Sequence, residues 1–189
     1  MLRRVLSSRL FVGWTLGIAT VIVLAGVAAA AIVFGGMYDT SAKTQHSKLV
    51  AWGIHHTMMH SVQRRAAQTG PLPGTASFWS GAREYQAHCL SCHGGTGMDR
   101  APWAKAMLPT PPFLVDSSSH WSRAELYAIV HDGVKMTGMP AWGEIESDRQ
   151  VSDVVAFLQV MPRLTPLQFQ QVMAKAGAQP LNGGATMPR

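Results

Sequence analysis

The chain has 189 residues, of which 47% are hydrophobic and 14% are charged; it contains two cysteines and carries a formal net charge of +6. A domain usually has about 100–200 residues, so this length accommodates one small domain with appendages. The apolar content excludes a disordered chain, and two cysteines exclude a disulfide-rich scaffold. Globular proteins are about 25% charged, so the low charged fraction indicates a membrane segment.

The positive charge lies outside the part of the chain that we expect to fold. Residues 77–162 hold six basic and nine acidic side chains, a net charge of −3. The other residues hold ten basic and one acidic side chain, a net charge of +9. Nucleic-acid binding needs a basic folded domain with clustered charges, so no nucleic-acid partner is expected.

Residues 10–38 are an uncharged, mostly apolar stretch of 29 residues. A spanning helix needs about 20 apolar residues, whereas a signal-peptide core has about 7–15. We therefore predict a retained transmembrane helix at 10–38. Arg3, Arg4 and Arg9 precede it, which places residues 1–9 in the cytoplasm and the remainder outside.

Residues 39–74 are predicted to be an extracytoplasmic linker that contains an amphipathic helix. Apolar side chains recur at every fourth position from Val50 to Ala66, which forms one stripe along a helix. The sequence Gly-Pro-Leu-Pro-Gly at 70–74 ends this unit.

Three histidines, His55, His56 and His60, lie within this linker. His56 and His60 are four residues apart, so they share one face of a helix. The preferred interpretation is a helix that packs against a partner, and ligation of a metal ion or a second haem is the alternative.

Residues 75–162 are predicted to be a small all-α domain, followed by a C-terminal tail at 163–189. No segment shows the alternation of a strand. Ser122 and Glu125 have the spacing of a capping box. The helices are expected near 79–87, 122–131 and 147–160, with Ser147 or Ser152 as the cap of the last one and a proline-rich loop at 94–119.

The two cysteines lie in the pentapeptide Cys89-Leu90-Ser91-Cys92-His93. C-x-x-C-H is the attachment sequence of a c-type haem. Two thiols on one helical turn form thioethers to neighbouring vinyl groups of the porphyrin, and the adjacent imidazole reaches the iron. The motif therefore predicts one covalent haem (heme c), attached at Cys89 and Cys92, with His93 as an iron ligand.

A C-x-x-C motif has three other uses besides haem attachment. A redox dithiol does not need the histidine and usually lies in a βαβ pattern. A structural zinc site needs four ligands, and the sequence has no second cysteine pair. A plain disulfide between Cys89 and Cys92 is the remaining alternative.

An electron carrier fills both axial positions of its haem iron, commonly with histidine and methionine. Met139 is the preferred distal ligand because Gly138 lets the backbone approach closely and Pro140 stiffens the segment. Met136, one turn earlier, is its main competitor. The downstream candidates were Met98, Met107, Met136, Met139 and Met161.

Residues 79–162 resemble the class I cytochrome c family in its bacterial, single-haem, membrane-anchored form. The resemblance rests on the Cys89-to-His93 signature after a short helix, on residues 127–143 and on the final helix with residues 155–158. It implies three to five helices around one covalent haem, with His93 as the proximal ligand and Met139 as the distal ligand.

Five further residues have less specific expected roles. Trp142 is expected at the haem edge or in the core, and the Pro102 carbonyl is expected to accept a hydrogen bond from His93 Nδ1–H. His88 and His131, like His120, are expected at the surface or at helix ends.

The sequence therefore predicts a membrane-anchored periplasmic electron carrier of a bacterial inner membrane rather than an enzyme. Its expected partners are redox proteins at the membrane, and a place as the cytochrome subunit of a larger respiratory or dehydrogenase complex is preferred. The alternatives are a haem enzyme or gas sensor with an open distal site, and a tethered binding module whose cysteines form a bridge.

Overall fold

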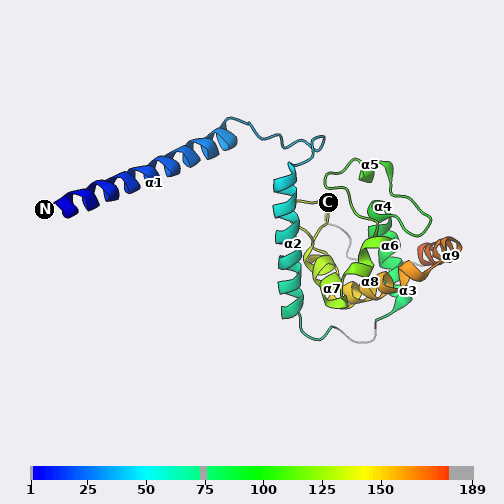
Figure 1. Ribbon diagram of the computed structural model, residues 1–189. Helices are drawn as coiled ribbons and strands as arrows, with labels where there is room; N and C mark the ends of the chain where they lie inside the picture. The colour runs from blue at the N-terminus through cyan, green and yellow to red at the C-terminus, as the bar shows by residue number, and fades with distance from the viewer. Residues whose placement is uncertain (1, 73–75, 179–189) are drawn as a thin grey trace. The chain divides into compact units, whose positions relative to one another are not determined.

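The computed structural model describes residues 2–72 and 76–178, with side chains from residue 9 onward, and Figure 1 shows that the chain is helical. Within those ranges there is no strand, only an isolated bridge between Gly95 and Met98. The chain divides into two compact units, residues 1–44 and 45–189. The all-α fold class expected from the sequence is confirmed.

The first unit is built around helix α1 (Leu2–Phe34). Its segment Arg9–Phe34 has 26 residues, and none of its most apolar stretch is buried. At about 1.5 Å per residue this segment is about 39 Å long, which exceeds the roughly 30 Å hydrocarbon core of a bilayer. Compared with the predicted range 10–38, the helix begins earlier, at Leu2, and ends earlier, at Phe34. Just beyond its last turn, Gly36 adopts a φ of 62°.

The second unit begins with helix α2 (Lys48–Gln68), which packs along α7 (Arg123–Asp132). The side chain of Ser47 caps the N-terminus of α2. Val62 is fully buried, and Arg65 donates to the Ala128 carbonyl at 3.3 Å and pairs with Asp132 at 2.5 Å. Only the second half of the apolar stripe is therefore covered.

The segment that carries the cysteines is one continuous helical rod. It consists of α3 (Phe78–Glu84), a π-helical turn (Tyr85–Cys89) and α4 (Leu90–His93). Helix α8 (Asp148–Val160) crosses α3 closely. At the crossing, a Cβ on Gly81 would lie 2.0 Å from the Asp153 carbonyl oxygen, so only glycine fits there.

Capping boxes begin the two helices α7 and α8. Ser122 and Glu125 form the first, as predicted, and Ser147 and Gln150 form the second. Ser152, the other cap candidate, is instead buried inside α8. Short elements complete this region: α5 (Pro102–Lys105), α6 (Leu114–Ser117) and the 3₁₀ turns Ser118–His120, Trp142–Glu144 and Met161–Arg163.

A further helix, α9 (Pro166–Gly177), occupies the region that was expected to be a tail. Thr165 caps it through a capping box with Gln168. Phe169 is fully buried and contacts the Tyr85 ring at a centroid distance of 6.4 Å. The packed domain therefore extends past residue 162, while residues 179–189 and part of the predicted boundary at 70–74 lie outside the described residues.

The core lies where α3, α7, α8 and α9 meet, and Figure 1 shows these helices grouped with α2 along one side. Tyr85 and Phe157 are fully buried with ring centroids 5.2 Å apart. The buried Tyr85 hydroxyl donates to the Gly94 carbonyl at 2.6 Å. The core thus holds the end of α4, where His93 lies.

Two glycine-to-alanine changes test the helix crossing. Gly81→Ala should lower the free energy of unfolding by more than about 2 kcal/mol, because the new methyl group meets rigid backbone. Gly53→Ala, in the first half of α2 with no atom near its Cβ position, should raise it by about 0.5–1 kcal/mol. Thermal unfolding followed by circular dichroism measures both. Equal stability of Gly81→Ala and the parent protein would contradict the close crossing.

Candidate functional site

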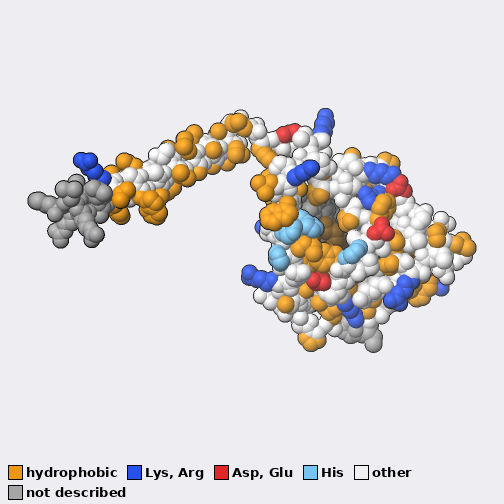
Figure 2. Space-filling model, in the orientation of Figure 1, with side chains coloured by type: hydrophobic (Ala, Val, Ile, Leu, Met, Phe, Trp, Pro, Cys, Tyr) orange, Lys and Arg blue, Asp and Glu red, His pale blue; other side chains and the backbone are white. Residues whose placement is uncertain are grey.

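A cavity of about 280 Å³ lies in the second unit, within the usual size range of small-molecule sites. Figure 2 shows a hollow bordered by hydrophobic side chains, with histidine side chains over α2 beside it. Its apolar lining comes from several segments: Leu114, Trp121, Leu126, Ile129, Val130, Val134 and Leu158. The proline-rich segment contributes Pro109, Pro111 and Pro112.

The structure brings all four predicted site residues to this cavity. Cys89, Cys92 and His93 line it from the helical rod, and Met139 lines it from the loop after α7. The two cysteines are not joined to each other, and both are partly buried. The plain disulfide alternative therefore has no support in this arrangement.

The π-helical turn and Gly94 shape the rod around the motif. A π-helical turn inside an α-helix frequently marks a functional position, and here it ends at Cys89, the first cysteine. Gly94 ends the rod with a φ of 64°. A Cβ at Gly94 would lie 2.7 Å from the Met98 carbonyl oxygen, so glycine is required for the chain to turn away after His93.

His93 is oriented by a backbone carbonyl. Its Nδ1 lies 2.8 Å from the Pro112 carbonyl oxygen, so the prediction that Pro102 supplies this carbonyl was wrong. Pro102 instead begins α5. With Nδ1–H donating to Pro112, the second ring nitrogen, Nε2, keeps its lone pair for a metal ion.

Burial is the main cause that lowers the pKa of His93, and the nearby Arg100 guanidinium adds to it. The hydrogen bond to Pro112 acts in the opposite direction. The net lowering keeps the imidazole neutral at pH 7, the form that binds iron.

The thiol of Cys89 is in an environment that disfavours redox exchange. Burial, with smaller effects from Cys92 and Glu84, raises its pKa to about 12. A reactive dithiol needs a lowered thiol pKa, because the thiolate is the nucleophile. The redox-dithiol alternative is therefore disfavoured.

The structure separates the methionine candidates. Met139 is partly buried, and its N–H donates to Thr137 Oγ1 at 3.0 Å. Met136 is 81% exposed with a φ of 62°, and it does not line the cavity. Met58 of α2 also lines the cavity, as does Met107. Met58 was not among the predicted ligand candidates, although its position in the apolar stripe of α2 indicated that it is partly buried.

His88 was expected at the surface or at a helix end, and it lies in the last turn of the π-helical segment. It lines the cavity, its side chain is 25% exposed, and its ring centroid lies 5.0 Å from that of Trp142. Trp142 also lines the cavity, as expected for a residue at its edge. His120 is exposed, and His131 is half-buried against the Tyr127 ring.

The three histidines of α2 are exposed, and none of them lines the cavity. His56 Nδ1 lies 2.9 Å from the Trp52 carbonyl oxygen, and its ring packs against the Trp52 ring with centroids 4.7 Å apart. These side chains therefore lie on the exposed surface of α2, outside the lining of the cavity.

Together, the helical fold, the C-x-x-C-H motif on a cavity wall and a neutral, oriented histidine define a c-type cytochrome domain. Residues 76–158 match the family model described as cytochrome c oxidase, cbb3-type, subunit III. This segment is a class I c-type cytochrome domain, and the resemblance seen in the sequence is confirmed. No curated protein and no solved structure gives a significant match to the chain.

The residues present fit a c-type haem, the group that this family implies. Cys89 and Cys92 are free and stand on the wall of the same cavity as His93. The rest of the lining is largely apolar, as a porphyrin requires. The chain is therefore a haem-carrying electron-transfer protein.

Cysteine substitutions test the attachment. The intact mass of the full-length protein should exceed that of its polypeptide by one haem, because the chain has one pair of attachment thiols. Replacing both Cys89 and Cys92 by alanine should abolish haem staining on denaturing gels, whereas Ser91→Ala, between them, should retain it. Stain in the double variant, or a mass corresponding to two haems, would contradict the assignment.

Proposed function

We propose that this chain is a membrane-anchored, periplasm-facing electron carrier with one c-type haem. Cys89 and Cys92 hold the haem by thioethers, and His93 and Met139 are the two iron ligands. The observation that carries the proposal is the convergence of these four side chains on one largely apolar cavity. The bound haem supplies an iron that accepts and releases a single electron.

The chain's own residues keep the site unchanged during transfer. The Pro112 carbonyl fixes the His93 ring, and the Thr137 hydroxyl fixes the backbone of Met139. The Val134 N–H also donates to the Met139 carbonyl at 3.2 Å, which closes the loop. A rigid ligand pair lowers the rearrangement that each electron transfer needs, so the site favours transfer over catalysis at an open position.

Helix α1 is proposed to anchor the protein in a bacterial inner membrane. Its length and apolar surface support this role. Arg3, Arg4 and Arg9 precede the apolar stretch, which favours a cytoplasmic N-terminus and a periplasmic haem domain. The net −3 charge of residues 77–162 would steer the domain toward basic redox partners.

A permanent place as a cytochrome subunit of a respiratory or dehydrogenase complex is favoured over simple tethering. The first half of α2 exposes four large apolar side chains, of which Leu49 (76%), Trp52 (60%) and Ile54 (47%) are the most exposed. Exposed apolar side chains gathered on one helix are typical of an interface. We infer that this half of α2 packs against another subunit.

Methionine substitutions test the distal ligand. Met139→Ala should give a haem whose reduced form binds carbon monoxide at once, because the sixth position is open. Met136→Ala is the matched control, and its spectrum should equal that of the parent protein. Visible spectra of the reduced proteins, with and without carbon monoxide, measure the effect.

Two results would overturn the ligand assignment. Carbon monoxide binding that appears in Met107→Ala or Met58→Ala, but not in Met139→Ala, would move the ligand to that residue. Immediate binding by the unchanged protein would favour the haem enzyme or gas sensor.

Purification in mild detergent tests the complex. The unchanged protein should co-purify with further redox subunits in fixed ratio, and replacing Leu49, Trp52 and Ile54 by serine should release it. Leu167→Ser, at a residue that is 64% exposed on α9, is the matched control and should remain in the complex. A protein that purifies alone from its native membrane would contradict complex membership.

A further inference from the structure

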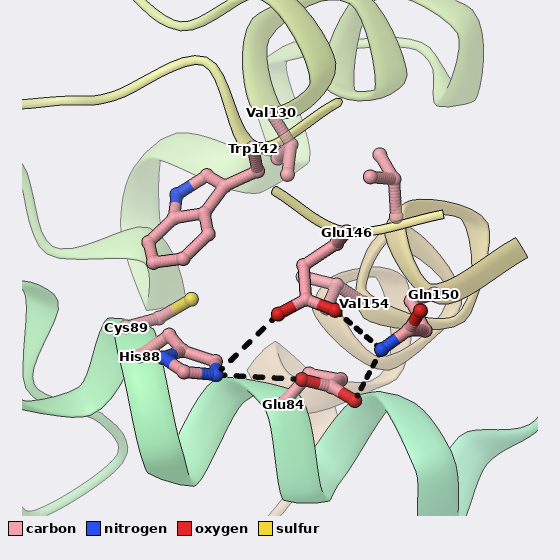
Figure 3. A pocket seen from close by; sticks show the side chains of 9 residues that line it. Glu84, His88, Cys89, Val130, Trp142, Glu146, Gln150 and Val154 are labelled. Atoms are coloured by element: carbon pink, nitrogen blue, oxygen red, sulfur yellow. Dashed lines mark hydrogen bonds and ion pairs between the residues drawn. The ribbon is translucent and has the colours of Figure 1, made fainter. Parts of the chain in front are cut away.

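A second group of polar side chains lies beside the haem cavity and has no part in the function proposed above. Glu84 is the last residue of α3, His88 lies in the π-helical turn and Glu146 just precedes α8. Figure 3 shows the three side chains turned toward one another, with Gln150 of α8 on the side of the two carboxylates that is opposite to His88.

The three side chains are spaced as the ligands of a metal ion are. His88 Nε2 lies 3.6 Å from Glu84 Oε2 and 3.7 Å from Glu146 Oε1. One ligand atom from each residue lies within 4.8 Å of the others. Tetrahedral zinc bonds of about 2.0–2.1 Å place neighbouring ligand atoms roughly 3.3 Å apart, so small side-chain shifts would complete the site.

Gln150 holds the outer oxygens of both carboxylates. Its Nε2 donates to Glu84 Oε1 at 3.2 Å and also to Glu146 Oε2. The inner oxygens, Glu84 Oε2 and Glu146 Oε1, are thereby left facing His88. Hydrogen bonds of this kind, made behind the ligands, orient the carboxylates of metal sites.

A buried oxygen without a hydrogen-bond partner is independent evidence for a ligand between these groups. Glu84 is only 7% exposed, and its buried Oε2 has no hydrogen-bond donor. A buried charged oxygen without a partner is costly. Next to it lies a void of about 20 Å³, enough for one water molecule or ion.

The simplest alternative is a protonated His88 held between two glutamates. Charge-assisted N–H···O bonds are about 2.7–2.9 Å long, and both observed separations are clearly longer. The imidazole therefore donates to neither carboxylate.

We propose that Glu84, His88 and Glu146 bind one zinc-class divalent cation, with Gln150 as a positioning residue. One imidazole and two carboxylates are ligands that zinc accepts, and a fourth position is left for water. The ion would tie the end of α3 to the start of α8 beside Cys89. This proposal does not depend on the distal ligand or on complex membership.

The test uses the full-length, haem-loaded protein in detergent. His55, His56 and His60 are replaced by glutamine in every sample, because an exposed pair such as His56 and His60 binds zinc on its own. After treatment with a chelator and addition of zinc, we expect one zinc per chain by elemental analysis. X-ray absorption at the zinc edge should show one imidazole nitrogen and oxygen ligands at about 2.0–2.2 Å.

Isosteric variants locate the ion. In the same background, Glu84→Gln and Glu146→Gln should each weaken zinc binding at least about tenfold by titration calorimetry, and the double variant should abolish it. Gln150→Ala should weaken it about 10–100-fold. Glu144→Gln, at an exposed residue two positions before Glu146, is the matched control and should bind as the parent does.

An unchanged haem absorption spectrum in each variant shows that the domain is folded. The proposal is overturned if the histidine-depleted parent retains no zinc. It is also overturned if the glutamine variants bind zinc as the parent does, or if the absorption data show two or more imidazoles.

Discussion

The close crossing of α3 and α8 positions the haem site. At Gly81 the helices approach so closely that no side chain fits between α3 and the Asp153 carbonyl. Because α3 runs without a break into the π-helical turn and α4, this contact fixes where Cys89 and His93 stand. Helix α8 brings Leu158 to the same cavity. A contact with α8, which is far from the cysteine motif in sequence, therefore helps to determine where the motif lies.

Hydrogen bonds to loop residues orient the two proposed iron ligands. The Pro112 carbonyl holds His93, and the hydroxyl of Thr137 holds the Met139 backbone. Prolines suit the wall of such a cavity, because a proline has a fixed φ and no N–H that would need a partner there. Met136 has a positive φ and is exposed, which leaves Met139 as the methionine of this loop that lines the cavity.

Local signals in the sequence predicted the elements that depend on neighbouring residues. The capping box at Ser122 and the cysteine motif were identified because their residues are close along the chain. The partner of His93 was misassigned to Pro102, since only the path of the intervening loop brings Pro112 close. Helix α9 was missed although Thr165 and Gln168 have capping-box spacing; its burial depends on contacts with α3 that no local pattern reveals.

The haem cavity and the carboxylate cluster are electrostatically linked, because Cys89 and Trp142 line both. Charges interact more strongly in a protein interior than in water. The buried carboxylate of Glu84 and the partly buried one of Glu146, without a cation, would oppose the addition of an electron on the other side of this shared wall. A divalent cation between Glu84 and Glu146 would reverse the sign of that effect. If the proposed cation binds, the cluster would therefore influence how readily the haem is reduced, separately from the iron ligands themselves.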